Sequence, residues 1–459
     1  MKKIIIAFCV VIAIVVILPL VGNSATQKVL ETRVSLLTSN GVEIKNSSTD
    51  ATYFQTKKHY EFLVSDAPKF IEYLNQYAGV QLPPYIDTML DGGVVGIDIE
   101  YFNIPFVSDI LVDIYPLSLS TQMVKDIQKD DTSFYNYIKS LLEKKSILYH
   151  VNYSLRDSSF SGFIKDIDES YTFDNKTKIV FELNKATYSG NGLLVAPESL
   201  KSKISKINFE VSASDENIKF NLKNIAFDSN FKTSTTYSSD TIVEKFSVLM
   251  SEAGGVKAKL DVDDAKFDIS SNTQEEKAKF HTKSSFKKFD LKSQELNLIL
   301  SNFNYDIILD GVDKASYEEF RKLIALQQKN YSSSLDEELQ DALVKIVSKG
   351  LTLNIADLSV KKLSLDKKPS IDGFSIATKL VVKEILGLSL RSEDSFGKLI
   401  EKLSIDSTVK LSKEFYSQLN NRFPVTGMAN SFAKKDGDDI VFMLKFKDEN
   451  LKVNDKSIQ

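Results

Sequence analysis

The sequence predicts a β-dominated α+β fold, in which an extended, mostly antiparallel sheet with covering amphipathic helices follows one N-terminal transmembrane helix. Three observations predict it. Most of the chain alternates apolar and polar residues with a period of two, which is typical of half-buried strands. A few segments have the three-to-four-residue spacing of amphipathic helices. An uncharged apolar run from Ile4 to Val21 occupies the N-terminus.

The composition is that of a folded protein with an ordinary core. Apolar residues make up 42% of the 459 residues and charged residues 26%, which is too apolar for a disordered chain. A net charge of −4 without a basic block gives no electrostatic footprint for nucleic acid. The only cysteine, Cys9, lies in the apolar run, so the rest of the chain forms neither a disulfide nor a cysteine-ligated zinc site.

The apolar run predicts a membrane anchor. Its 18 residues span about 27 Å as a helix, close to the hydrocarbon thickness of about 30 Å. Lys2 and Lys3 precede it and are expected to stay cytoplasmic, which sends the remainder across the membrane. Cleavage after the small residues 22–24 is the alternative. Residues 1–24 are therefore expected to be a membrane anchor or an uncleaved signal.

Residues 25–200 predict a mixed α+β region. Asn40-Gly41, the strongest hairpin dipeptide, is expected to join two strands. Asp66 is placed to cap a helix that has Pro68 in its first turn. A second helical stretch is expected at about 121–145, and strands are expected on both sides of it.

Residues 201–312 predict an antiparallel β-rich region, because strand-like alternation follows strand-like alternation with short polar turns between. Residues 313–459 predict a helix pair and a C-terminal β region. In the second helix Ser334 and Glu337 form a capping box, and Gly350 follows its end. The chain closes on a hairpin whose alternation resumes at Leu451.

The order of these elements resembles the YdgA-like family of bacterial envelope proteins. The resemblance rests on the apolar N-terminus, on a capped helix entering "GLTLNIADLSVKKL" and "IDGFSIATKLVV", and on the closing "ENLKVNDKSI". Leu451, Val453, Asn454 and Lys456 match the closing motif, whereas Asp455 stands where the family has glycine. The resemblance implies an inner-membrane protein with its body in the periplasm, and it brings no catalytic residues.

The residues themselves predict no catalytic, cofactor-binding or metal-binding site. His59, His150 and His281 have no second ligand at metal-binding spacing. "DVDDAKFD" at 261–268 lacks the glycine and the glutamate of a calcium loop, and its alternation predicts two strand ends joined by a solvated turn. Three Ser-x-x-Lys matches fall in strand-like patterns, whereas a serine–lysine nucleophile needs a helical turn.

The predicted function is that of a non-enzymatic, membrane-anchored periplasmic envelope protein that binds lipid or another hydrophobic ligand, or acts as a scaffold. The 29 Phe and 18 Tyr fit an ordinary core, or a sheet whose apolar face is only partly covered. A self-associating interaction module and a hydrolase with a dispersed active site are the alternatives. The expected partners are the inner membrane, a hydrophobic ligand and further copies of the chain, with no cofactor and no nucleic acid.

Overall fold

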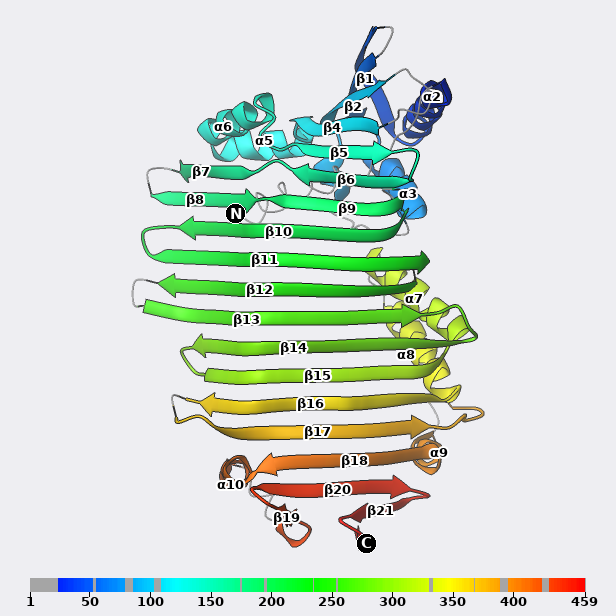
Figure 1. Cartoon of the computed structure of the whole chain (residues 1–459), viewed down its shortest axis with the longest axis vertical. Helices are drawn as coiled ribbons and strands as arrows, with labels where there is room; N and C mark the ends of the chain where they lie inside the picture. Colours follow the sequence, from blue (N-terminus) through cyan, green and yellow to red (C-terminus); the bar gives the residue numbers. More distant parts are fainter. Residues whose placement is uncertain are drawn as a thin grey trace. The chain divides into compact units, whose positions relative to one another are not determined.

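The computed structural model shows a β-dominated chain with a large antiparallel sheet and accompanying helices, as the sequence predicts (Figure 1). The described residues are 24–52, 55–78, 86–102, 109–173, 176–193, 196–233, 235–252, 255–329, 333–366, 368–388, 395–422 and 429–458. Contacts divide the chain into two compact units. Unit 1 contains residues up to 214 together with 223–231, and unit 2 contains 215–222 together with 232–459.

The predicted anchor at residues 1–24 lies outside the described residues, except for Ser24, which begins the first described helix. Within the parts of the chain that the structure describes, no helix combines the length and the apolarity needed to cross a bilayer. The N-terminal transmembrane helix therefore stays a prediction from the sequence.

Unit 1 contains short strands and the helices that pack around them. Its helices are α2 (Ser24–Thr38), α3 (Ala67–Ala78), α4 (Ile86–Leu90), α5 (Thr121–Asp130) and α6 (Thr132–Glu143). Its strands are β1 (Val42–Ala51), β2 (Gln55–Val64), β3 (Val94–Phe102), β4 (Asp109–Ser118), β5 (Tyr149–Ser154), β6 (Ser159–Ile164), β7 (Ile167–Phe173), β8 (Thr177–Asn184), β9 (Ala186–Leu193) and β10 (Ala196–Ser212). Strand β11 (Glu216–Thr233) contributes residues to both units.

The strands of unit 1 pair in the order β1-β2-β3-β4-β5-β6-β9-β10, every pair antiparallel. Strand β10 is long enough to pair with β9 along its first half and with β8 along its second, and β7 pairs with β8. Rings cover two glycines of this sheet: a Cβ on Gly96 would meet the Tyr115 ring at 2.4 Å, and one on Gly162 would meet the Tyr188 hydroxyl at 2.2 Å. These glycines are needed because the rings occupy the space of their side chains.

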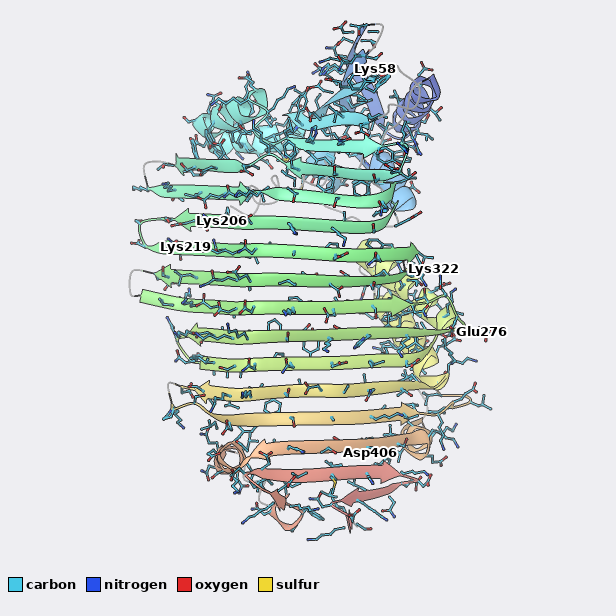
Figure 2. All side chains as sticks on the ribbon, in the orientation of Figure 1. Lys58, Lys206, Lys219, Glu276, Lys322 and Asp406 are labelled. Atoms are coloured by element: carbon cyan, nitrogen blue, oxygen red, sulfur yellow. The ribbon has the colours of Figure 1, made fainter. Side chains whose placement is uncertain are left out.

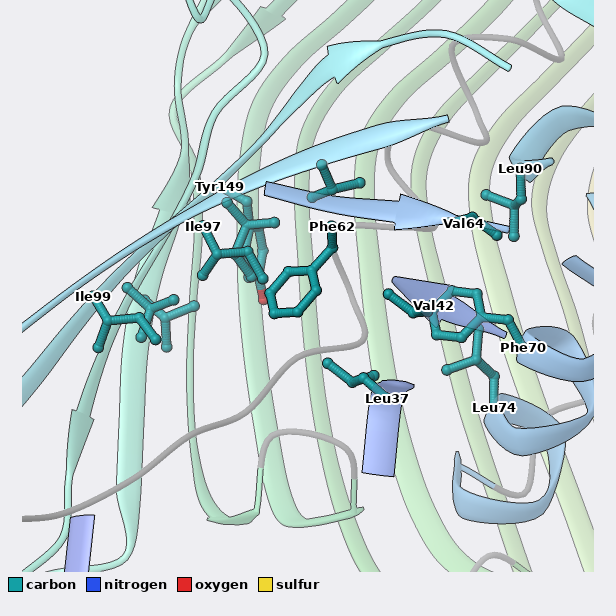
Figure 3. Close-up of a cluster of buried hydrophobic side chains, with 14 of the residues drawn as sticks. Leu37, Val42, Phe62, Val64, Phe70, Leu74, Leu90, Ile97, Ile99 and Tyr149 are labelled. Atoms are coloured by element: carbon teal, nitrogen blue, oxygen red, sulfur yellow. The ribbon is translucent and has the colours of Figure 1, made fainter. Parts of the chain in front are cut away.

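Unit 1 has a closed hydrophobic core. Side chains from α2, α3, α4 and strands β1 to β6 form one buried cluster, with Ile97 and Ile114 among its most buried members. Figure 3 shows Leu37, Phe70 and Leu74 from the helices and Phe62 and Ile97 from the strands, all of them members of this cluster. The helix predicted after Asp66 supplies this contact, and the Asp66 carboxylate accepts a hydrogen bond from the Lys69 amide as the predicted cap.

The hairpin predicted at Asn40-Gly41 is wrong, because the segment before it is helix α2. Gly41 has φ +84° and follows the end of this helix, where the Asn40 side chain donates to the Leu36 carbonyl. The same dipeptide that favours a hairpin turn also favours a helix C-terminus, because both need a left-handed residue. The stretch predicted as one helix at 121–145 is two helices, since Asp131 caps α6 through the Ser133 and Phe134 amides.

Unit 2 is built on longer strands. These are β12 (Thr236–Glu252), β13 (Gly255–Asn272), β14 (Lys277–Ser293), β15 (Asn297–Asp313), β16 (Leu351–Leu365), β17 (Ile371–Val382), β18 (Leu403–Ser412), β19 (Lys434–Asp436), β20 (Asp439–Lys447), β21 (Asn450–Val453) and β22 (Lys456–Ile458). Its helices are α7 (Lys314–Lys329), α8 (Ser333–Ser348), α9 (Ser395–Lys402) and α10 (Lys413–Arg422).

The strands of unit 2 pair with their neighbours in chain order from β12 to β18, and β20 then pairs with β18. The predicted terminal hairpin is present as β20 and β21, and β22 adds one more short strand. Because residues directly opposite each other share a face, the register gives continuous rows across the strands. One such row is Phe246–Val262–Phe289–Leu300–Leu363.

A crease crosses strands β12 to β17 and shifts the alternation of each by one residue. In β13 the apolar positions are 260 and 262 before it, and 265, 267 and 269 after it. Two polar residues, Asp263 and Asp264, lie between, and Asp264 is left-handed with φ +51°. Asn302 has φ +50° at the same place in β15. The pairing register of neighbouring strands does not change at the crease, so the apolar positions of all these strands change by one residue at the same place. The apolar face therefore continues across the crease.

Candidate functional site

The helices of unit 2 cover only part of the apolar face of its sheet. We call the half-buried part on β12 to β16 the open apolar face. Its members are Phe246, Val248, Leu260, Phe267, Phe286, Phe289, Leu291, Leu298, Leu300, Phe303, Tyr305, Leu358 and Leu365. Large apolar side chains of an ordinary core are buried, so this face resembles a core that lacks its second layer.

The helices of unit 2 cover the ends of this face. Helices α7 and α8 lie behind one end of β13 to β16, where Tyr317 and Ile346 pack on Ala278 and Val312. Glu276 in the β13–β14 turn and Lys322 of α7 are at this same end (Figure 2). Helix α10 packs on β17, β18 and β20, where the Phe415 ring stacks on Phe374 at 5.5 Å.

Aromatic rings run across the open apolar face. Phe267, Phe286 and Phe303 lie on three neighbouring strands, with ring centroids 5.4 Å and 5.6 Å apart. Strands lie about 4.8 Å apart, so the five strands β12 to β16 span about 19 Å. The face is therefore long in both directions and mostly apolar, and its polar side chains include the buried Ser284, the Tyr305 phenol, Thr241 and Thr282.

The opposite face of the same strands is charged. Next to the apolar row that runs from Phe246 to Leu363, the adjacent residues of the same strands form a second row on the opposite face. This row is Lys245–Asp263–Lys288–Ser301–Lys362. Asp290 is buried on this face, with one carboxylate oxygen 3.0 Å from the Lys288 ammonium and 3.6 Å from that of Lys292. One face therefore carries salt bridges, while the other is mostly apolar.

A polar network lies in unit 1. Nδ1 of His59 is 2.6 Å from one oxygen of Asp98, and the other oxygen accepts from the Tyr115 hydroxyl and the Lys145 ammonium, each at 2.9 Å. Burial of the carboxylate opposes ionisation, but the hydrogen bonds from His59, Lys145 and Tyr115 outweigh it and lower the pKa of Asp98. Burial raises the pKa of the Tyr115 phenol.

Each histidine contacts one aspartate across the sheet. His150 Nδ1 lies 2.6 Å from Asp113, and His281 Nε2 lies 2.8 Å from Asp306. Asp98 and Asp113 are directly opposite each other, so β2 to β5 carry a row His59–Asp98–Asp113–His150. Among the described residues no group of three or more His, Cys, Asp or Glu side chains has the geometry of a metal site.

Two other sequence motifs lie inside strands. The 261–268 stretch is the middle of the single strand β13, so the turn predicted there is wrong; the left-handed Asp264 allows two polar residues in succession without a strand end. The three Ser-x-x-Lys matches lie in β14, β16 and β18. The first pair is separated by the sheet: Ser284 is buried on the apolar face, whereas Lys287 reaches Asp264 at 3.1 Å.

The C-terminal motif is a structural clamp. The Asn454 side chain donates to the carbonyls of Phe432 at 2.6 Å and Val441 at 2.8 Å, and it accepts from the Met443 amide at 2.9 Å. Lys456 donates to the Ser431 carbonyl at 2.7 Å. The buried Val453 packs in the cluster of β20, and Leu451 faces Phe446 in the ladder.

Asp455 has φ +66° and Asn454 has φ +47°. Both central residues of the two-residue turn between β21 and β22 are thus left-handed, which is the geometry of a type I′ hairpin turn. The position where the YdgA-like motif has glycine is one where glycine is free of strain.

No family model matches the chain, and neither the curated proteins nor the solved structures searched contain a match. The resemblance to the YdgA-like family therefore stays a prediction from the sequence.

Proposed function

We propose that this chain is a non-enzymatic, membrane-anchored envelope protein, with its body in the periplasm, that binds lipid acyl chains along the open apolar face. The half-buried Phe and Leu side chains of β12 to β16 support this proposal, because they form a broad apolar surface without a covering layer. The predicted anchor supports an acyl chain as the ligand, since it keeps the body beside a bilayer.

Burial energies are sufficient for binding without any dedicated polar residue. Each 100 Å² of apolar surface removed from water contributes about 2.5 kcal/mol. An acyl chain lying along Phe286 and Leu300 would remove surface from both partners. A scaffold that self-associates and a hydrolase with a dispersed site stay alternatives from the sequence.

The test compares two adjacent residues of β15 that face opposite sides of the sheet. Leu300 lies on the open apolar face, and Ile299 lies on the charged face in the row of Asp290. Both are half-buried, so Leu300→Gln and Ile299→Gln are matched in position and chemistry. The full chain is purified in mild detergent, incubated with a photoactivatable fatty acid, and crosslinked.

We expect wild type and Ile299→Gln to label equally, and Leu300→Gln to label several-fold less. Mass spectrometry of the labelled peptides should place the crosslinks on β12 to β16. Labelling that does not distinguish the two variants, or crosslinks confined to unit 1, would overturn the proposal.

A further inference from the structure

A second surface, in unit 1, has the opposite chemistry. A shallow hollow of ≈ 510 Å³ is built on β5, β6, β9 and β10, with Asp109 of β4 at its margin. Its lining consists mainly of serine and asparagine side chains, which both donate and accept hydrogen bonds. Its position is fixed by strands rather than loops, so its polar groups are held at set spacings.

The register arranges these groups in two ladders. Asn152 lies opposite Ser161, and Ser161 lies opposite Ser189. One row further along the strands, Ser154 lies opposite Ser159, and Ser159 opposite Asn191. Neighbouring members of a ladder are about 4.8 Å apart, because that is the distance between strands.

Most of these side chains have unused hydrogen-bonding capacity. In the described part of the chain, Asn152, Ser154, Ser159, Ser161 and Ser189 make no side-chain hydrogen bond to another residue. Ser161 and Ser189 are exposed. A ligand rich in hydroxyl groups can replace the water on these groups without breaking a bond within the protein.

A flat apolar ring adjoins the hollow. Phe163 lies two residues from Ser161 on β6 and is 43% exposed, and its ring stacks on that of His150 at 4.8 Å. The cation of Lys201 is neutralised by Asp228 at 2.7 Å, so the hollow has no unpaired cation for an anionic ligand. An exposed ring beside regularly spaced donors and acceptors suits a sugar, which has an apolar C–H face and hydroxyl edges.

We propose that the hollow on β5, β6, β9 and β10 binds a neutral glycan segment, with its hydroxyl groups on the two ladders and one sugar ring on Phe163. The site is independent of the open apolar face. A protein that binds lipid in unit 2 and neutral glycan in unit 1 would contact two different components of a cell envelope.

Isothermal titration of the full chain in detergent tests the proposal, with chitotetraose and cellotetraose as the probes. We expect saturable binding of at least one of them. The double variant Ser161→Ala/Ser189→Ala should weaken it about tenfold, since two hydrogen bonds are lost at roughly 0.7 kcal/mol each. Phe163→Ser should weaken it by a similar factor.

Two controls separate this site from other effects. Ser170→Ala removes an exposed hydroxyl from β7, outside the hollow, and should leave glycan binding unchanged. Leu300→Gln should also leave it unchanged, so a failure of the lipid proposal does not affect this test. Absence of saturable binding at millimolar glycan, or equal affinities for the wild type and the double variant, would overturn the inference.

Discussion

Units 1 and 2 use the same two-residue alternation but bury their apolar residues to different degrees. In unit 1 the strands β1 to β6 lie under α2, α3 and α4, and residues such as Ile97 and Ile114 are buried almost completely. In unit 2 the longer strands have helices at their ends, where two buried apolar clusters form. Between the ends a few apolar side chains, such as Val262 and Leu363, are buried, and most of the larger ones are half-buried. Alternation therefore shows that a strand has an apolar face, but not whether that face is covered.

The difference has an energetic consequence. A side chain in a closed core loses its packing partners on all sides when it is shortened, whereas a half-buried side chain loses them on one side. Unit 2 has to derive more of its stability from the long backbone ladders and from local clamps such as Asn454. Variants in the two units can test this.

The largest expected effect is in the closed core. Ile114→Ala should lower the free energy of unfolding of unit 1 by about 3 kcal/mol, because Ile114 is completely buried. Leu300→Ala on the open apolar face should lower that of unit 2 by less than half as much. Urea unfolding followed by pulse proteolysis, with fragments assigned to each unit, measures both. Equal losses would mean that the open face is covered in solution.

The second effect is at the C-terminal clamp. Asn454→Ala removes three side-chain hydrogen bonds to the backbone and should destabilise the β20–β22 region by about 2 kcal/mol. Asp455→Gly is the matched control: it relieves a left-handed residue at φ +66° and should leave stability unchanged or raise it. Hydrogen exchange of the β20 amides reports both, and unaltered protection in Asn454→Ala would contradict the clamp.

Sequence patterns predicted where strands lie better than they predicted how far each strand continues. Strict alternation identifies the strands of unit 2, but at "VDDA" in β13, "FKKF" in β14 and "LSNF" in β15 two polar residues interrupt it. A template of period two interprets each interruption as a strand end. The interruptions align only once the register is known, and that alignment, repeated in strand after strand, was the signal available in the sequence.

The candidate surfaces were predictable to different extents. A partly covered apolar face was one of two alternatives that the Phe and Tyr content left open, and the choice depended on how much of the sheet the helices reach. Helix α10, which covers part of β17 to β20, was missed because its apolar stripe is short. The pairing of His59 with Asp98 was not predictable, since these residues are far apart in the sequence and the register alone brings them together.

The third prediction concerns the crease of unit 2. Asn302→Val places a β-branched residue at φ +50° and should destabilise unit 2 by about 1–2 kcal/mol, whereas Asn302→Gly fits this conformation. Because Asn302 is exposed, the loss arises from the backbone and not from burial. Urea midpoints of the two variants measure the difference. If the Val and Gly variants have equal urea midpoints, the crease does not require a left-handed residue at position 302.

The smallest effect is expected at the polar network of unit 1. The pKa of Asp98 is lowered in the folded chain, so its ionised form contributes stability above the ordinary pKa of 3.8, and this contribution is lost as pH falls through the folded value. Asp98→Asn should therefore destabilise unit 1 at pH 7, by less than about 1 kcal/mol because the side chain is 39% exposed. The wild type and the variant should therefore converge only as pH falls through the folded pKa of Asp98, which lies below 3.8. If the difference in free energy of unfolding between the wild type and Asp98→Asn grew on acidification, His59 and Lys145 would not stabilise the carboxylate. The polar side chains of unit 1 would then resemble the surface salt bridges of unit 2.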